Sequence, residues 1–380
     1  MLSTTEDLAE FADRARSAPA IGLDTEFMRE KTYFPRLCLV QLSLADGTVI
    51  VDPLAIGDLS PLFSVLRDTK IVKVLHAGTQ DLEIFYRLMG TTAAPIFDTQ
   101  LAANLAGFPQ QTGYATLVKD LVGVQLDKAD TFTDWARRPL TKAQVEYAHD
   151  DVRYLLPVYE KLKGSLQRDE RIEWLQEDFD RLADVAFFEV VPEEQWRRLK
   201  RVSGLNRRQL AVARAVAAWR EREAQRKDTP KRWVLSDESI VEIARRMPAA
   251  AEDLAAIRGV PDKLARRSYG AVLQAVTEAR ALPDDALPIL DRRRRRPAQD
   301  TDGAVDLMVA LVRLRAREHG VAMPILASRD ELERLAAGDR EAHALLEGWR
   351  RKIVGEELLA LLDGRLTLRV KDGVLEVRKR

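Results

Sequence analysis

The distribution of strand and helix signals divides this chain into two parts of different structural class. Three apolar, β-rich runs lie within residues 19–51, and an ADG turn signal separates the last two: PAIGLDTEF, LCLVQLSL and TVIVD. After residue 205 such runs are almost absent until the last twenty residues. We therefore expect an α/β part followed by an all-helical part.

The α/β part continues with helix and strand patterns in alternation. They occupy residues 59–67, 71–76, 81–89, 96–98 and 99–106, of which the second and the fourth are strands. A three-stranded meander followed by this alternation predicts a mixed sheet flanked by helices. One long helix is then expected from Thr141, as its N-cap, to Gly164, where it ends.

Breaks in the helical part suggest further domain boundaries. We predict five segments: an α/β domain at 1–165, a helical connector at 166–202, a helical domain at 203–283, an Arg/Pro-rich linker at 284–300, and a second helical domain at 301–380. The last segment ends in RLTLRVKDGVLEVRKR, whose period-two alternation around Lys-Asp-Gly predicts a terminal hairpin.

Charge is distributed unequally along the chain, although the net charge is zero. The first 200 residues contain 23 Lys and Arg against 32 Asp and Glu, whereas the remainder contains 37 against 28. This asymmetry is expected for a carboxylate-bearing half that holds cations, followed by a half that holds phosphates. Unevenly spread solubilising charge is the alternative explanation.

The location of the protein is predicted from what its sequence contains. No apolar run approaches the roughly 18 residues that span a bilayer, and the N-terminus is acidic where a secretory signal would be basic. Cys38 is the only cysteine, so neither an internal disulfide nor a multi-Cys zinc site can form. We expect a cytoplasmic protein without a membrane partner.

Two acidic residues stand out at the end of the first strand. Alternation places the side chains of Asp24 and Glu26 on the same face of that strand. Two carboxylates on one face repel each other unless a cation lies between them, and a divalent ion is the usual solution. A solvent-facing strand edge is the alternative.

Further acidic residues could join this pair. Asp81 lies after the strand at 71–76, although an acid in the first turn of a helix is also ordinary helix chemistry. Tyr147 and Asp151 are four residues apart and so share one helical face. Four carboxylates and a phenol are what two-metal phosphodiester hydrolysis needs, with two Mg²⁺ or Mn²⁺ ions and the phenol orienting the attacking water.

Several segments resemble the ribonuclease D family of 3′→5′ exonucleases. They are IGLDTEFMREKTYFPRLCLVQLS, VLHAGTQDLEIF, FDTQLAA and LDKADTFTDWARRPLTKAQVEYAHDDVRYLLPVY. The resemblance implies a ribonuclease H-like fold and a catalytic set of four acids and a tyrosine. It assigns Asp24 and Glu26 to the first motif, Asp81 to the second, and Tyr147 with Asp151 to the third, with all four acids as metal ligands.

The helical part also carries a resemblance. The segments LAVARAVAAWREREAQRKDTPKRWVLSDESIVEIARRMP and LAAIRGVPDKLARRSYGAVLQAV are similar to the domain named for helicases and ribonuclease D, the HRDC domain. Such domains are auxiliary nucleic-acid-binding or interaction modules. Residues 301–380 stand where the family carries a second, degenerate copy, so the resemblance implies two HRDC-like domains.

The function implied is 3′→5′ exoribonuclease activity that trims RNA 3′ ends and releases nucleoside 5′-monophosphates. The partner is RNA with a single-stranded 3′ end, with tRNA precursors as the substrate that the family implies; no obligate protein partner is evident. Two alternatives remain open: a 3′→5′ DNA exonuclease of the same superfamily, and an RNA-binding protein with a silent site.

Other residues have structural interpretations that we prefer. His76 is expected to be a packed or hydrogen-bonded residue, Cys38 a buried apolar side chain, and Asp98 a helix cap. Contact with nucleic acid and a structural role both remain open for Trp135, Arg137, Arg138, the Arg292–Arg296 run, and the group Arg29, Lys31 and Tyr33.

Overall fold

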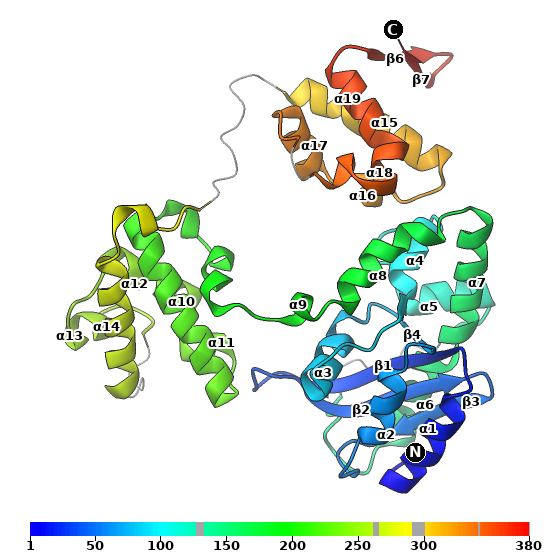
Figure 1. Cartoon of the computed structure of the whole chain (residues 1–380), viewed down its shortest axis with the longest axis horizontal. Helices are drawn as coiled ribbons and strands as arrows, with labels where there is room; N and C mark the ends of the chain where they lie inside the picture. The colour runs from blue at the N-terminus through cyan, green and yellow to red at the C-terminus, as the bar shows by residue number, and fades with distance from the viewer. Residues whose placement is uncertain (127–132, 261–265, 291–300, 341–342, 380) are drawn as a thin grey trace. The chain divides into compact units, whose positions relative to one another are not determined.

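The computed structural model describes residues 1–126, 133–260, 266–290, 301–340 and 343–379 (Figure 1). Contacts divide these residues into two compact units. The first contains residues 1–26 and 37–188 together with the described residues of the C-terminal segment from 301. The second contains residues 27–36 and the described residues of 189–290.

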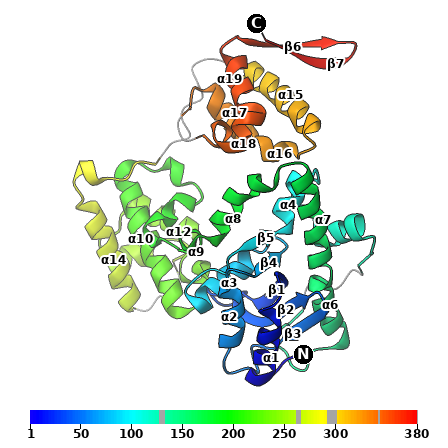
Figure 2. The same ribbon diagram turned by 45° about the vertical axis from the view of Figure 1, so that its right-hand side comes forward.

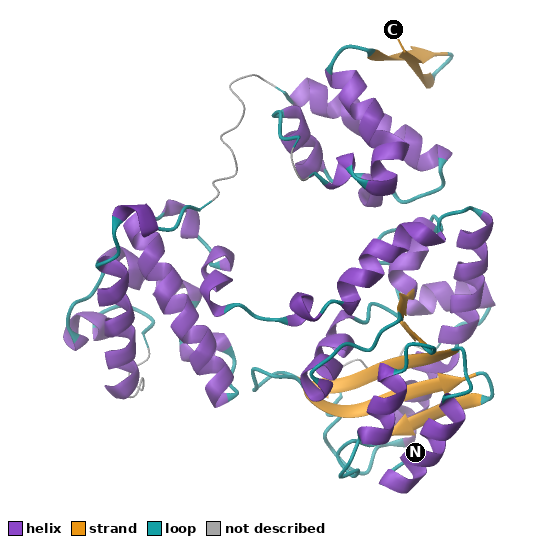
Figure 3. Cartoon of the chain, viewed as in Figure 1, coloured by secondary structure: helices purple, strands orange, loops and turns teal. Residues whose placement is uncertain are grey.

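A five-stranded mixed sheet forms the centre of the first unit (Figure 3). Its strands are β1 (Ala20–Met28), β2 (Arg36–Leu44), β3 (Gly47–Val51), β4 (Val72–Leu75) and β5 (Ile96–Asp98). Their order is β3-β2-β1-β4-β5, with β2 antiparallel to β3 and with β4 parallel to both β1 and β5. The predicted mixed sheet is confirmed, and β1 is its central strand.

Helices cover both faces of this sheet. The helices between residues 1 and 188 are α1 (Thr5–Ala15), α2 (Ser60–Arg67), α3 (Thr79–Met89), α4 (Thr99–Leu105), α5 (Tyr114–Leu117), α6 (Lys142–Arg153), α7 (Leu155–Arg168), α8 (Gln176–Ala183) and α9 (Val185–Phe188). One apolar core joins α1, α2 and α3 to the sheet, and a second joins α4 and α7 to it. The sheet is therefore a buried middle layer.

The helix predicted over residues 141–164 is two helices, so that prediction is wrong in its continuity. The helix α6 ends at Arg153, its C-cap Tyr154 has φ and ψ of −109° and 4°, and α7 runs past Gly164 to Arg168. Pro157 explains the break, because its ring has no N–H for the carbonyl of Arg153 and clashes with that carbonyl in a continuous helix.

The C-terminal segment packs its helices within the same unit. It contains α15 (Asp302–Glu318), α16 (Met323–Leu326), α17 (Arg329–Ala336), α18 (Gly348–Arg350) and α19 (Glu356–Leu362). Their buried side chains belong to the same apolar cluster as those of α4 and α7, and the rings of Trp174 and Trp349 stack at 4.8 Å. The predicted hairpin is confirmed as β6 (Leu366–Lys371) and β7 (Val374–Lys379), which Figure 2 shows beside α19.

The second unit is helical apart from its short N-terminal segment. Its helices are α10 (Arg207–Lys227), α11 (Lys231–Val234), α12 (Asp237–Arg246), α13 (Ala251–Ala255) and α14 (Arg266–Arg280). Both units also contain short 3₁₀ and π segments. These are Val118–Val122, Ile172–Leu175, Pro192–Arg198, Val202–Gly204, Asp284–Ala286, Ala344–Leu346 and Arg351–Gly355. None of the described helices has the length and apolarity to cross a membrane.

Candidate active site

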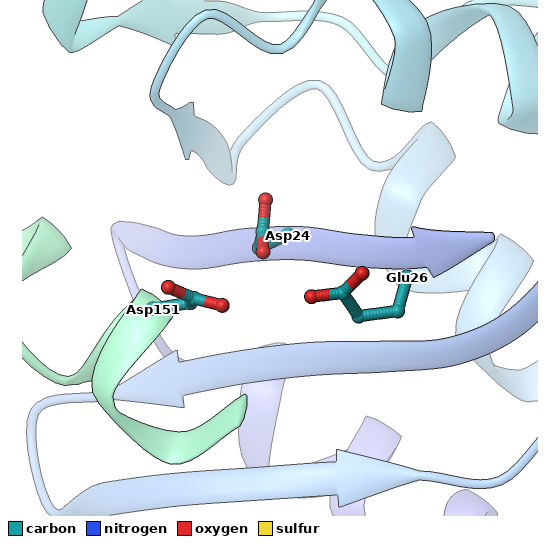
Figure 4. Close-up of side chains that lie close together, drawn as sticks. All are labelled: Asp24, Glu26 and Asp151. Atoms are coloured by element: carbon teal, nitrogen blue, oxygen red, sulfur yellow. The ribbon is translucent and has the colours of Figure 1, made fainter. Parts of the chain in front are cut away.

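Three carboxyl groups converge beside the central strand. Asp24 and Glu26 come from β1 and Asp151 from α6, and one carboxylate oxygen of each lies within 4.8 Å of the others. Figure 4 shows Glu26 and Asp151 extending toward one another with Asp24 next to them. The expected placement of Asp24 and Glu26 on one face of the strand is confirmed, and Asp151 joins them.

The start of α6 explains how Asp151 reaches the strand. The Thr141 hydroxyl accepts the backbone N–H of Gln144, and the Gln144 side chain accepts the backbone N–H of Thr141, which together form a capping box. Ala148 and Val152 of α6 are fully buried. The buried stripe thus fixes the rotation of α6, and with it the direction of the neighbouring Asp151.

Tyr147 lies one helical turn before Asp151, and its phenol lowers the pKa of that carboxyl. Its ring is 6.0 Å from that of Trp135, measured between centroids, and Trp135 is itself buried. Burial and the neighbouring acids raise the pKa of Tyr147 above its usual value of 10.0. The phenol therefore keeps its proton at neutral pH and can donate it in a hydrogen bond.

Asp81 stands outside this group of three but close to it. It lies in the first turn of α3 and is 7% exposed, and its carboxylate accepts a hydrogen bond from the hydroxyl of Thr25. The turn before α3 is tight, because a Cβ on Gly78 would lie 2.5 Å from the side chain of Leu75. Asp81 is near enough to Asp24 to raise the pKa of that carboxyl.

Burial and mutual repulsion oppose ionisation of the acids. Burial, followed by the charges of Asp81, Asp151 and Glu26, raises the pKa of Asp24 well above 3.8. Burial and then Asp151 raise the pKa of Glu26 to about 8. Burial raises the pKa of Asp151 to about 7, although the nearby Tyr147 phenol lowers it.

The cluster has the donor set of a divalent-cation site. Within the described part of the chain, no Lys or Arg forms an ion pair with Asp24, Glu26 or Asp151. Hard cations such as Mg²⁺ and Mn²⁺ prefer carboxylate oxygens, and a bound cation would reverse the repulsion that now raises these pKa values. The residues present therefore fit such an ion.

Comparison with known proteins agrees with this geometry. A family model described as 3′-5′ exonuclease matches residues 1–167, and an HRDC domain model matches residues 209–276. The ribonuclease D of Gluconacetobacter diazotrophicus is 47% identical over 372 residues, which cover 97% of this chain and 94% of that protein. The chain belongs to the ribonuclease D family.

Two further relatives support the assignment. The ribonuclease D of Acidiphilium cryptum is 44% identical over 379 residues, covering 99% of this chain and 96% of that one. The crystal structure of Escherichia coli RNase D, described as an exoribonuclease involved in structured RNA processing, matches with a TM-score of 0.83 and 36% identity, over 96% of this chain and 98% of that one. The predicted exonuclease fold and the ribonuclease D resemblance are confirmed, and one HRDC domain is confirmed, whereas the second is not.

Three structural interpretations made from the sequence are also confirmed. His76 hydrogen-bonds to Thr99 at 3.0 Å, and burial lowers its pKa below 6.5. Cys38 is fully buried. Asp98 caps α4 by accepting the N–H groups of Gln100 and Leu101.

Two of the residues left open in the sequence have structural partners. Arg138 binds Asp52 through two hydrogen bonds of 2.6 and 2.8 Å and also donates to the Cys38 carbonyl, so its guanidinium is already engaged. Tyr33 is buried in the second unit. The Arg292–Arg296 run lies outside the described residues.

Tyr114 is a neighbour of the site that the sequence did not suggest. Its hydroxyl accepts the N–H of Tyr154 at 3.0 Å and donates to the carbonyl of Asp150 at 3.3 Å. Tyr154 is the C-cap of α6, where the helix breaks, and its N–H also points to the carbonyl of Val152. The only signal available was Pro157, which predicts the break but not the tyrosine that occupies it.

Proposed function

We propose that this ribonuclease D family member removes nucleotides from single-stranded RNA 3′ ends and releases nucleoside 5′-monophosphates, with tRNA precursors among its substrates. The observation that carries the proposal is the convergence of three carboxyl groups that are costly to ionise without a cation. Two divalent ions, Mg²⁺ or Mn²⁺, are the proposed cofactors.

The residues of the site are proposed to act either as metal ligands or as groups that position ligands and water. Asp24, Glu26, Asp81 and Asp151 are the metal ligands, and the Thr25 hydroxyl holds Asp81 in place. Bound divalent ions would activate water and neutralise charge on the phosphate. Tyr147 orients the attacking water through its protonated phenol, and the carboxylate of Asp151, one helical turn later, is proposed to fix the direction of that phenol.

The HRDC domain is proposed to hold the body of the RNA in a basic groove. Two adjoining hollows of about 600 and 510 Å³ lie on the second unit and share Lys200, Ser236 and Glu238. Their lining includes five cations for which the described residues show no ion pair. These are Arg198, Lys200, Arg201, Arg232 and Arg258. Cations left unpaired in a groove are available to phosphates.

An exposed aromatic residue follows a groove residue in the sequence. Trp233 follows Arg232 in α11 and is 55% exposed, which is uncommon for a tryptophan. Exposed aromatic rings beside cations can stack unpaired bases while the cations bind the backbone. We therefore assign single-stranded RNA, rather than a duplex, to the groove.

The C-terminal segment is a weaker candidate for backbone binding. Residues 301–380 contain 15 Lys and Arg against 14 Asp and Glu, whereas residues 201–290 contain 17 against 12. We propose that it is the second, degenerate HRDC-like domain, within the five segments expected from the sequence. A cytoplasmic location is proposed from the single cysteine.

The test combines Asp24→Asn with Asp151→Asn. Removal of both charges should abolish release of nucleotides from a 5′-labelled RNA in Mg²⁺, while RNA affinity measured in EDTA stays unchanged, since the groove is intact. Asp169→Asn, which alters an exposed acid, is the matched control and should cleave normally. Residual trimming by the double variant would refute the site, and equal degradation of a matched DNA end would refute the preference for RNA.

A further inference from the structure

The segment that follows Glu26 is bound by the HRDC domain. The strand β1 ends at Met28, and residues 27–36 belong by their contacts to the second unit. Tyr33, seven residues after Glu26, is 7% exposed and clusters with Ala224 and Val234 of that unit. A loop attached to the metal-site strand thus packs against the HRDC domain, in a small apolar cluster with Ala224 and Val234.

Hydrogen bonds fix the backbone of this loop. The N–H groups of Tyr33 and Phe34 donate to the Asp228 carboxylate at 3.1 and 2.9 Å. Asp228 is the C-cap of α10 and has left-handed dihedrals, with φ of 45° and ψ of 54°. Asp and Asn tolerate this conformation better than other residues with a side chain, so an Asp is well suited to this C-cap position.

The Tyr33 side chain has polar partners of its own. Its hydroxyl donates to the carboxylate of Glu221, which is fully buried, and accepts from Gln225 Nε2 at 3.1 Å. Lys231 Nζ lies 3.3 Å from the Glu221 carboxylate and 5.9 Å from the centre of the Tyr33 ring. A buried carboxylate that accepts from Tyr33 makes the docking specific, because loss of a partner leaves polar atoms unsatisfied.

From these contacts we propose that Tyr33 and Asp228 are positioning residues for the metal site: by anchoring residues 27–36, the HRDC domain restricts the movement of Glu26. The anchor acts through chain continuity, because only four residues separate the end of β1 from Tyr33. Glu26 is one of the acids that must stay close to its neighbours despite repulsion. This inference rests on the proposed function of the acid cluster.

The variants separate anchoring from folding. Asp228→Ala removes the acceptor of two N–H groups and places Ala at a positive φ, whereas Asp228→Asn keeps an acceptor oxygen and tolerates that φ. Tyr33→Phe removes only the hydroxyl and keeps the ring in the apolar cluster. Asp228→Asn is therefore the matched control for Asp228→Ala, and Tyr33→Phe covers the possibility that the alanine variant folds poorly.

The first readout is trypsin cleavage of the loop in the full chain. Arg29 and Lys31 are exposed, so cleavage after them reports release of the anchor. We expect cleavage about tenfold faster in Asp228→Ala and Tyr33→Phe, the factor that corresponds to about 1.4 kcal/mol. The asparagine variant should match the unmodified protein. Unchanged cleavage in both anchor variants would overturn the proposal.

The second readout is Mn²⁺ binding by calorimetry together with steady-state kinetics. Both anchor variants should bind Mn²⁺ several-fold more weakly and show a lower kcat, with an unchanged KM for RNA. The anchor variants could be cleaved faster by trypsin and still have the Mn²⁺ affinity and kcat of the asparagine control. The anchor would then be purely structural, and the positioning role would be refuted. If the unmodified protein bound Mn²⁺ but cleaved no RNA, the proposed function would be refuted. The Mn²⁺ affinities of the anchor variants and the asparagine control would still show whether the loop positions Glu26.

Discussion

The acid cluster and the basic groove carry opposite charge, and they differ above all in burial. Asp24, Glu26 and Asp151 are half-buried and packed together with raised pKa values, whereas the cations of the groove line an open surface. Like charges packed together away from water require a specific counterion at a fixed place, whereas exposed charges attract any polyanion with an affinity that salt reduces. The first region can therefore provide chemistry and the second only attachment.

The strongest test of this contrast is a single substitution in the cluster. Asp24→Asn should lower kcat by at least about 10³-fold, because a ligand to the activating cation is lost. The RNA concentration for half-maximal binding in EDTA should stay the same. Single-turnover cleavage and filter binding measure the two quantities separately, and a parallel loss of both would mean that the two regions are not independent.

The next prediction concerns stability of the protein without metal. Glu26 and Asp151 have pKa values of about 8 and 7 in the folded protein, above their ordinary values of 4.5 and 3.8. A group whose pKa is higher in the folded protein than in the unfolded chain adds to the free energy of unfolding at low pH. This contribution is fully present below about pH 4 and is lost as the pH rises toward 8. In EDTA the melting temperature should therefore fall between pH 5 and pH 8.

Metal binding and substitution of an acid should both change the melting temperature, because both relieve the repulsion among the carboxylates. At pH 8 in EDTA, Asp24→Asn should stabilise the protein by about 2 kcal/mol, which is roughly 4–8 °C in melting temperature. Mn²⁺ should raise the melting temperature of the unmodified protein and release protons, and should act less on the variant. A melting temperature in EDTA that does not change with pH would contradict the buried repulsion.

Tyr147 offers a smaller effect within the cluster. Tyr147→Phe keeps the ring beside Trp135 but removes the phenol, so kcat should fall by about 10- to 100-fold. Mn²⁺ affinity should change little, because the phenol is not a proposed ligand. A calorimetric titration checks this, and a loss of metal binding equal to that of Asp24→Asn would make the tyrosine part of the metal shell.

Sequence reasoning predicted the cluster because its cues are local. Asp24 and Glu26 follow the two-residue period of a strand, and Tyr147 and Asp151 follow the four-residue spacing of a helix. The approach of the strand to the helix came from the family resemblance, since no spacing within the sequence encodes it. The mixed sheet was predictable for the same local reasons, through its runs of apolar residues and turns.

The loop after Glu26 shows where such reasoning fails. Tyr33, in a basic stretch beside the acids, was considered for nucleotide contact, yet its hydroxyl reaches Glu221, 188 residues away. A tyrosine's partner at that separation depends on how the second unit folds, and neither periodicity nor charge reveals it. The break at Tyr154 is different, because Pro157 was visible and its effect on the carbonyl of residue 153 was predictable.

The smallest predicted effect belongs to the groove. Substitution of both Arg198 and Arg258 by Ala should weaken RNA binding about tenfold at moderate salt, because each arginine is expected to neutralise one phosphate. For single-stranded RNA, the loss of two such contacts reduces the slope of log affinity against log salt by about 1.4. Cleavage of a short oligonucleotide at saturation should not change, since the acid cluster is intact.

The control for the groove is Lys352→Ala, which removes an exposed cation from the C-terminal segment and should leave the salt slope unaltered. Point substitutions are better than deletion of residues 201–380, because side chains of α15 and α19 share a core with α4 and α7, and their loss would expose it. If the arginine pair and the lysine control reduce the slope equally, phosphates are held diffusely by the protein surface. The acid cluster would then be a specific site, whereas RNA would bind to basic side chains spread over the protein surface and not to the proposed groove.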